Sequence, residues 1–165
     1  IALPTGRSEL DRMVDIDAAP VLRGDTVYAV SYQGRVAAVA QRSGTLLWSR
    51  DFSSSSGLDV DRERLYVGDD RDHVWAIARD GGASYWRQEA LQHRQLTAPA
   101  FADGSVAVGD LEGYLHFLDG VDGRIVARVR VGSGPMTAAP LVRGDRIYAV
   151  TTDGGLVALR VGSES

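Results

Sequence analysis

Residues 19–30 read Ala19-Pro20-Val21-Leu22-Arg23-Gly24-Asp25-Thr26-Val27-Tyr28-Ala29-Val30, and this stretch returns along the chain about every 40 residues. A second copy is Ala98-Pro99-Ala100-Phe101-Ala102-Asp103-Gly104-Ser105-Val106-Ala107-Val108, and a third is Ala139-Pro140-Leu141-Val142-Arg143-Gly144-Asp145-Arg146-Ile147-Tyr148-Ala149-Val150. A degenerate copy occupies residues 57–68. A period of about 40 built from short extended segments and turns is typical of β-propeller blades. We therefore expect an all-β fold.

The repeats predict about four blades of four antiparallel strands each. Turns rich in Gly and Asp separate the strands, as hairpins require. Strands that are apolar on both faces indicate blades packed face to face. The predicted blades comprise residues 18–52, 57–90, 98–132 and 138–161, the last of which lacks a fourth strand. Residues 1–12 are predicted to supply the fourth strand of a preceding blade, because Gly6 aligns with Gly44 and Leu10 with Trp48.

Such an array leaves strand edges that can pair with another chain. Three solutions are open: a closed four-bladed ring, two copies that complete an eight-bladed ring as a homodimer, or one part of a longer propeller. Of these we favour one part of a longer ring, which could also form a dimer. A chain that starts at Ile1, with no signal-peptide pattern, is expected to be a mature form or an excised part of a longer chain.

The composition excludes several kinds of chemistry. The 165 residues carry a net charge of −4, which argues against non-specific nucleic-acid binding. Cysteine is absent, so the chain forms no disulfide and has no thiolate nucleophile. All 18 basic residues are arginine, which excludes a Schiff-base lysine. Catalytic motifs such as Gly-x-Ser-x-Gly are not found, and we expect no enzyme activity.

Two tryptophans share one spacing pattern. Trp48 ends Ala38-x-Ala40-x3-Gly44-x3-Trp48, and Trp86 ends Ala76-x-Ala78-x3-Gly82-x3-Trp86. The pattern resembles the tryptophan-docking repeat of pyrroloquinoline-quinone enzymes, which implies that each ring packs against the next blade. Only one copy of the aspartate in that repeat survives, and no cluster of calcium ligands is visible. We therefore expect neither a cofactor nor a metal ion.

The acidic pair Asp15-x-Asp17 lies in a connection that precedes a blade. Alternate residues of an extended segment share a face, so the two carboxylates together can accept an arginine or lysine of a partner. The Asp69-Asp70-Arg71-Asp72 run is expected to be a solvated turn. His73, His93 and His116 fall at unrelated offsets and predict no zinc site.

Three stretches resemble the BamB family, the propeller lipoproteins of the bacterial outer-membrane β-barrel assembly (BAM) machinery. They are residues 9–20 (ELDRMVDIDAAP), 92–99 (QHRQLTAP) and 108–115 (VGDLEGYL). The resemblance covers almost the whole chain. It implies the second half of an eight-bladed ring and a non-catalytic scaffold that binds a POTRA domain of the BamA subunit. In the family an Asp-x-Asp pair takes part in that contact, and here it falls on Asp15 and Asp17.

The same resemblance implies other properties of the whole protein. It implies the periplasmic face of the outer membrane, a lipid anchor in the half that is absent here, and contact with other BAM subunits. Two other functions are open: a quinoprotein-like (PQQ-type) enzyme fragment, and a propeller whose exposed strand edges bind unfolded outer-membrane proteins.

Overall fold

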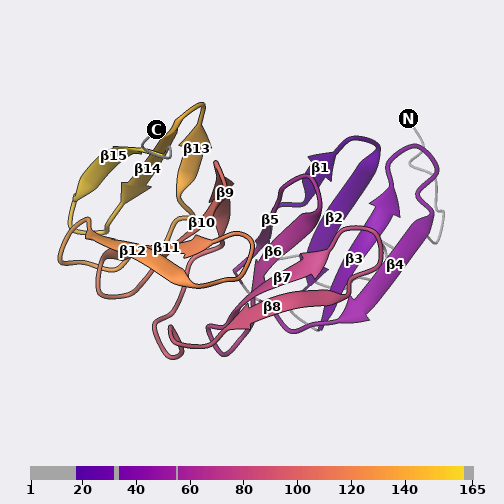
Figure 1. Ribbon diagram of the computed structural model, residues 1–165, viewed down its shortest axis with the longest axis horizontal. Coiled ribbons are helices and arrows are strands. Elements are labelled where there is room, and N and C mark those ends of the chain that lie inside the picture. Colours follow the sequence, from indigo (N-terminus) through magenta and orange to yellow (C-terminus); the bar gives the residue numbers. More distant parts are fainter. Residues whose placement is uncertain (1–17, 32–33, 55, 162–165) are drawn as a thin grey trace, which may run out of the picture.

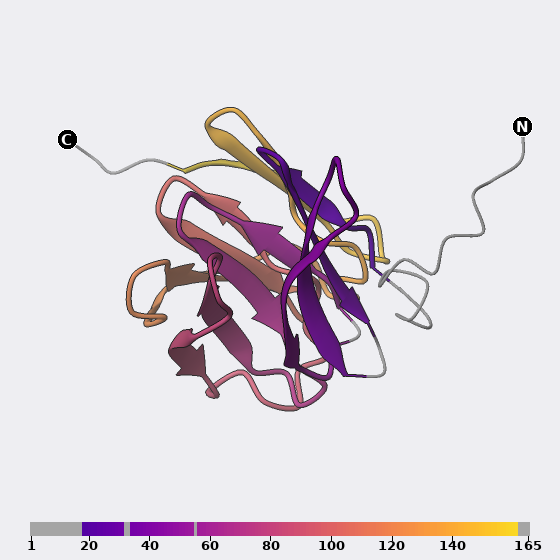
Figure 2. The same ribbon diagram turned by 90° about the vertical axis from the view of Figure 1, so that its right-hand side faces the viewer.

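The computed structural model of the protein describes residues 18–31, 34–54 and 56–161. Within these ranges the chain forms fifteen strands in four antiparallel sheets, and no helix. Figure 1 shows the sheets following one another in chain order, and the view turned by 90° shows that they do not lie in one plane (Figure 2). The predicted all-β class is confirmed.

Each sheet is one blade. Blade 1 contains β1 (Val21–Arg23), β2 (Thr26–Ser31), β3 (Arg35–Ala40) and β4 (Leu46–Asp51). Blade 2 contains β5 (Leu58–Val60), β6 (Arg64–Gly68), β7 (Val74–Ala78) and β8 (Ser84–Gln88). Blade 3 contains β9 (Ala100–Ala102), β10 (Ser105–Gly109), β11 (Tyr114–Asp119) and β12 (Ile125–Arg130). Blade 4 contains β13 (Leu141–Arg143), β14 (Arg146–Val150) and β15 (Leu156–Arg160).

In blades 1 to 3 the two middle strands are largely buried on both faces, whereas the last strand is at least half exposed. In blade 4 the residues of β14 and β15 alternate between more buried and more exposed positions. In blade 2 almost every residue of β6 and β7 is buried, because blades 1 and 3 cover the two faces of the sheet. In blade 1 the residues of β4 alternate between half-buried and exposed. This difference explains why the middle strands read as continuous apolar runs rather than as alternating patterns.

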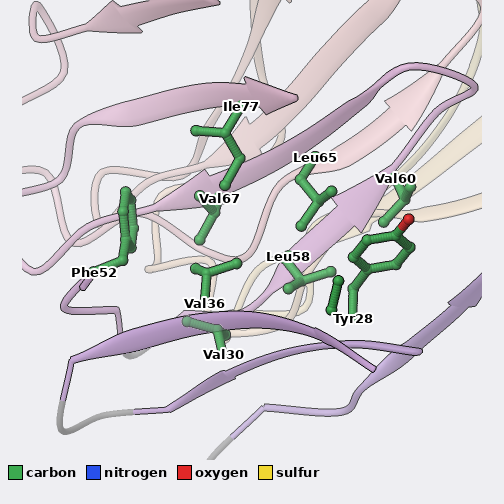
Figure 3. Close-up of a cluster of buried hydrophobic side chains, with 10 residues drawn as sticks. Tyr28, Val30, Val36, Phe52, Leu58, Val60, Leu65, Val67 and Ile77 are labelled. Carbon is green, nitrogen blue, oxygen red and sulfur yellow. The ribbon is translucent and has the colours of Figure 1, made fainter. Parts of the chain in front are cut away.

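Apolar clusters between neighbouring sheets hold the blades together. Between blades 1 and 2, Tyr28 and Val36 of the first sheet face Leu65 and Ile77 of the second, with Phe52 from the connection closing the cluster (Figure 3). Similar clusters lie between blades 2 and 3 and between blades 3 and 4. Full burial of each such aliphatic side chain contributes roughly 1.5–3 kcal/mol, so these interfaces supply most of the stability.

The first strand of every blade lines a shared central cavity of about 610 Å³. Three of these strands follow an Ala-Pro pair, namely Ala19-Pro20, Ala98-Pro99 and Ala139-Pro140. Proline has no backbone N–H, so it is tolerated where a strand begins. The repeated motif therefore marks the start of the first strand in blades 1, 3 and 4.

Blade 4 has three strands, and β15 pairs with β14. The proposed fourth strand of a preceding blade, residues 1–12, lies outside the described residues. Nowhere in the described part of the chain is there a helix long and apolar enough to cross a membrane.

Candidate partner-binding rim

The turns of an antiparallel blade alternate between its two ends, so the array has two rims. The first, here called the connection rim, carries the links between blades and the turns between second and third strands. Its described parts include residues 69–73, 89–99, 110–113, 131–140 and 151–155. The opposite rim, here called the turn rim, carries residues 24–25, 41–45, 61–63, 79–83, 103–104, 120–124 and 144–145.

A carboxylate of blade 2 holds the link to blade 3. Asp72, at the β6–β7 turn, accepts the backbone N–H groups of Gln95 at 3.0 Å and Leu96 at 2.8 Å. His93 and Gln95 have φ of 65° and 51°, a left-handed conformation that is costly for residues other than glycine. Asp72 thus fixes a link whose local conformation is unfavourable by itself.

Asp69 of the same turn is tied to its own blade. It accepts hydrogen bonds from the backbone N–H groups of Arg71 and His73, both at 2.9 Å, and from Trp75 Nε1 at 2.8 Å. His73 Nδ1 lies 2.9 Å from its second oxygen. Burial raises the pKa of Asp69, but these hydrogen bonds outweigh it and hold the pKa below its usual value.

Asp110 occupies the corresponding turn of blade 3 and is completely buried. Its Oδ2 accepts from Arg94 Nη1 at 2.6 Å and lies 2.8 Å from His116 Nε2. Its Oδ1 accepts the N–H groups of Glu112 at 3.0 Å and Tyr114 at 2.9 Å. Burial opposes ionisation, yet the donors, with His116 foremost, keep the pKa of Asp110 below its usual value. Four donors engage both oxygens, so this Asp–His pair is structural rather than a free general base.

Blade 4 also has an aspartate, Asp153, that connects a turn to a link between blades, here at the surface. Asp153 accepts the hydroxyl of Thr151 at 2.5 Å and the N–H of Ser133 at 2.8 Å, which joins the β14–β15 turn to the link from blade 3. The Thr151 hydroxyl, followed by the Ser133 amide, lowers the pKa of Asp153 to about 2. In blades 2, 3 and 4, therefore, an aspartate of a connection-rim turn forms hydrogen bonds with a link between blades: Asp72, Asp110 and Asp153.

The predicted partner-binding residues, Asp15 and Asp17, lie outside the described residues. Ala18, the next residue in the chain, is described. Its Cβ is 3.3 Å from the position that a Cβ on Gly57 would occupy, and the Cβ of Ala98 is 3.2 Å from that same position. The chain therefore enters the described region beside the links to blades 2 and 3.

Trp48 of β4 reaches from blade 1 to the turn rim of blade 2. Its Nε1 donates to the carbonyl of Arg79 at 2.7 Å. A Cβ on Gly82 would come within 3.0 Å of the ring, so only glycine leaves room for the ring at this distance. Gly82 also has a φ of 72°, which the turn requires. Glycine at this position therefore allows both the turn and the close packing of the Trp48 ring.

Trp86 of β8 makes the equivalent contact one blade later. Its Nε1 donates to the carbonyl of Gly120 at 3.1 Å, and a Cβ on Gly123 would lie 2.6 Å from its Cδ2. In blade 3 the corresponding residue is Ala127, and β12 is largely exposed. Val129 and Met136 pack between blades 3 and 4 instead.

The sequence analysis did not predict that Asp72, Asp110 and Asp153 bind the links between blades. The 69–72 run is a turn, as predicted, but the prediction that it is solvated is wrong for Asp69, whose side chain is 13% exposed. The available signal was the recurrence of an aspartate directly after Gly68 and Gly109, at the ends of β6 and β10. Among the described residues, no group of three or more His, Asp and Glu side chains could hold a metal ion.

Comparison with known proteins shows two matches to a family model described as "Outer membrane protein assembly factor BamB", over residues 1–88 and 79–163. A curated relative from Pseudomonas aeruginosa, with the same description, is 48% identical over 161 residues. The match covers 98% of this chain and 42% of the relative, so the chain spans less than half of that protein.

Solved structures include a BamB protein among the similar folds. The crystal structure of BamB from Moraxella catarrhalis matches with a TM-score of 0.83 at 29% identity, over 97% of this chain and 47% of that one. A quinohemoprotein alcohol dehydrogenase from Comamonas testosteroni matches with a TM-score of 0.71 at 18% identity, over 88% of this chain and 33% of that one. The second likeness shows a shared fold alone.

Proposed function

The chain belongs to the BamB family of outer membrane protein assembly factors, and from that premise we propose that it is a non-catalytic scaffold of the BAM complex. In this proposal it docks on a POTRA domain of BamA and so aids the folding and insertion of outer-membrane proteins. It acts at the periplasmic face of the outer membrane, held there by a lipid anchor of the full-length protein. The ring of that protein has eight blades, of which this chain contributes half.

The docking surface is the connection rim, with Asp15 and Asp17 as the acceptors for basic groups of the partner. The observation that carries this assignment is the set of hydrogen bonds by which Asp72 and Asp110 hold residues 94–96 of the link between blades 2 and 3. A preformed surface loses little conformational entropy when a partner binds, which favours a docking role. Trp48 and Trp86 serve this function indirectly, because they set the spacing of the blades that carry the rim.

A double substitution tests the site. We expect Asp15→Arg with Asp17→Arg to weaken binding of the BamA POTRA region by at least tenfold, since each lost charge contact costs roughly 2–5 kcal/mol when buried and less at a rim. The measurement is calorimetric titration of purified proteins. The matched control, Asp25→Arg with Asp80→Arg, makes the same charge change at two exposed carboxylates of the turn rim and should leave the affinity unchanged. Equal affinities for both double variants would refute the assignment.

The quinoprotein-like alternative rests on fold likeness at 18% identity and on the tryptophan spacing. It predicts that the chain takes up pyrroloquinoline quinone with calcium and gains dye-linked reductase activity. The scaffold proposal predicts neither, and an absorption spectrum after incubation and desalting separates the two.

A further inference from the structure

A hollow of about 870 Å³ opens on the turn rim, on the far side of the molecule from the connection rim. The turns that end β1, β5 and β9 surround it, and Val60 and Phe101 contribute its apolar wall. Four arginines line it, together with three carboxylates: Arg23, Arg62, Arg64, Arg79, Asp61, Glu63 and Asp103. So dense a group of arginines in a chain of net charge −4 requires an explanation.

Arg79 is held in place by neutral acceptors. Its Nη1 donates to the carbonyls of Asp61 at 3.0 Å and Arg62 at 2.8 Å, and its Nε donates to the Tyr28 hydroxyl at 3.1 Å. The guanidinium also lies 5.5 Å from the centroid of the Tyr28 ring. Among the described residues no carboxylate lies within ion-pair distance of it, so the Arg79 guanidinium is held in position by neutral groups alone.

Two more arginines extend this group. The side chain of Arg62 is exposed and makes no hydrogen bond or ion pair with any described residue. Arg64 lies 4.9 Å from the centroid of the Tyr85 ring, and its Nη1 is 3.6 Å from Glu63 and 3.9 Å from Asp61. Among the described residues Arg62 and Arg79 therefore have no carboxylate partner, whereas Arg64 has two.

A second hollow, of about 600 Å³, adjoins the first and shares Arg62, Glu63 and Arg79 with it. It contains Leu47 and Tyr85, which are each 54% exposed, beside Trp48. Together the two hollows form a groove, here called the arginine groove, in which Leu47 and Tyr85 lie near the shared arginines.

We propose that the arginine groove binds a short extended polypeptide segment that carries a carboxylate next to an apolar side chain. The carboxylate meets Arg62 and Arg79, because planar guanidinium groups match carboxylates in geometry and charge. The apolar side chain covers Leu47 and Tyr85. The carboxylates of Asp61, Glu63 and Asp103 disfavour a multiply charged phosphate. Since the groove and the connection rim are on opposite sides, one molecule can hold two polypeptides at once.

The test uses the full chain and the peptide acetyl-Gly-Phe-Glu-Gly-amide, with binding followed by intrinsic tryptophan fluorescence. We expect saturable binding that Arg62→Gln weakens about tenfold, the loss of one charge-assisted contact. Replacing Glu by Gln in the peptide should weaken binding equally, and Tyr85→Ser should also weaken it. The matched control is Arg146→Gln, which removes an exposed arginine of blade 4 outside the groove.

Three results would overturn the proposal. They are no saturable binding, binding that is indifferent to Arg62→Gln while a thermal melt shows the variant folded, and tighter binding of inorganic pyrophosphate than of the peptide. The last would indicate a small-anion site. None of these outcomes bears on POTRA binding, so this proposal and the proposed function can fail separately.

Discussion

Asp110 shows how much one buried residue organises in this molecule. Its two oxygens take four donors from three parts of the chain: the link between blades 2 and 3, the β10–β11 turn and β11. The charge is tolerated in the interior because every lone pair is used. Loss of the charge would therefore loosen the connection rim as well as blade 3.

We expect Asp110→Asn to lower the free energy of unfolding by roughly 1.5–3 kcal/mol at pH 7, the value of a hydrogen bond to a charged group. The folded-state pKa of Asp110 lies below its usual 3.8, so its stabilisation is present above that pH and is lost as the pH falls through the folded pKa. The difference between wild type and variant should accordingly shrink on acidification. Urea unfolding from pH 7 to pH 3 measures it.

Glu112→Gln is the control for Asp110→Asn, because Glu112 also contacts Arg94, at 3.2 Å, but is exposed. Exposed ion pairs contribute about 0–1 kcal/mol, so this variant should unfold almost as the wild type does. A gap between Asp110→Asn and wild type that stays constant over the whole pH range would show that the charge is not the cause.

The sequence alone did not predict the hydrogen-bond partners of individual aspartates. Turn chemistry located the 69–72 run correctly, but the partners of its carboxylates come from elsewhere: Trp75 from the next strand, and Gln95 and Leu96 from the next link. A local pattern gives the turn. It cannot show which distant N–H groups the fold brings to that turn.

At the scale of the element, neighbouring blades are connected by a tryptophan ring that packs against a glycine in a turn of the next blade, Trp48 on Gly82 and Trp86 on Gly123. Gly123 combines a φ of 76° with a Cβ position only 2.6 Å from Trp86 Cδ2. An alanine there is strained twice, once by its backbone conformation and once by the ring.

Gly123→Ala should destabilise the protein by about 2–5 kcal/mol, from about 1–2 kcal/mol of backbone strain and about 1–3 kcal/mol of overpacking. Gly144→Ala is the matched control, because Gly144 has a φ of 59° and nothing within 4 Å of its Cβ position. Gly144→Ala should lower the stability only by the contribution of backbone strain, about 1–2 kcal/mol. Thermal melting of both variants makes the comparison, and equal losses would contradict the docking role of Trp86.

The strands themselves were predictable because each is bracketed by turn residues. For example, β8 follows the turn residues Asp80-Gly81-Gly82, and β10 follows Asp103-Gly104. The joint between blades 3 and 4 was less predictable. Ala127 stands where blades 1 and 2 have Trp48 and Trp86, and the contact is made instead by Val129 and Met136, which belong to no repeated pattern.

At the scale of the whole molecule, four blades share a central cavity and expose two chemically different rims. The connection rim is fastened by carboxylates, whereas the turn rim carries the arginine groove. The 40-residue repeat was enough to predict blades. The number of blades in the complete ring, and the role of Asp15 and Asp17, came from the family resemblance, because periodicity alone sets neither ring size nor partner.

Hydrogen–deuterium exchange of the chain, alone and with the BamA POTRA region, tests the central claim most directly. Binding at the connection rim predicts slowed exchange in the segment that contains Asp15 and Asp17 and in residues 89–99, with the turn rim unchanged. Slowed exchange confined to the turn rim, or none at a saturating POTRA concentration, would contradict the account.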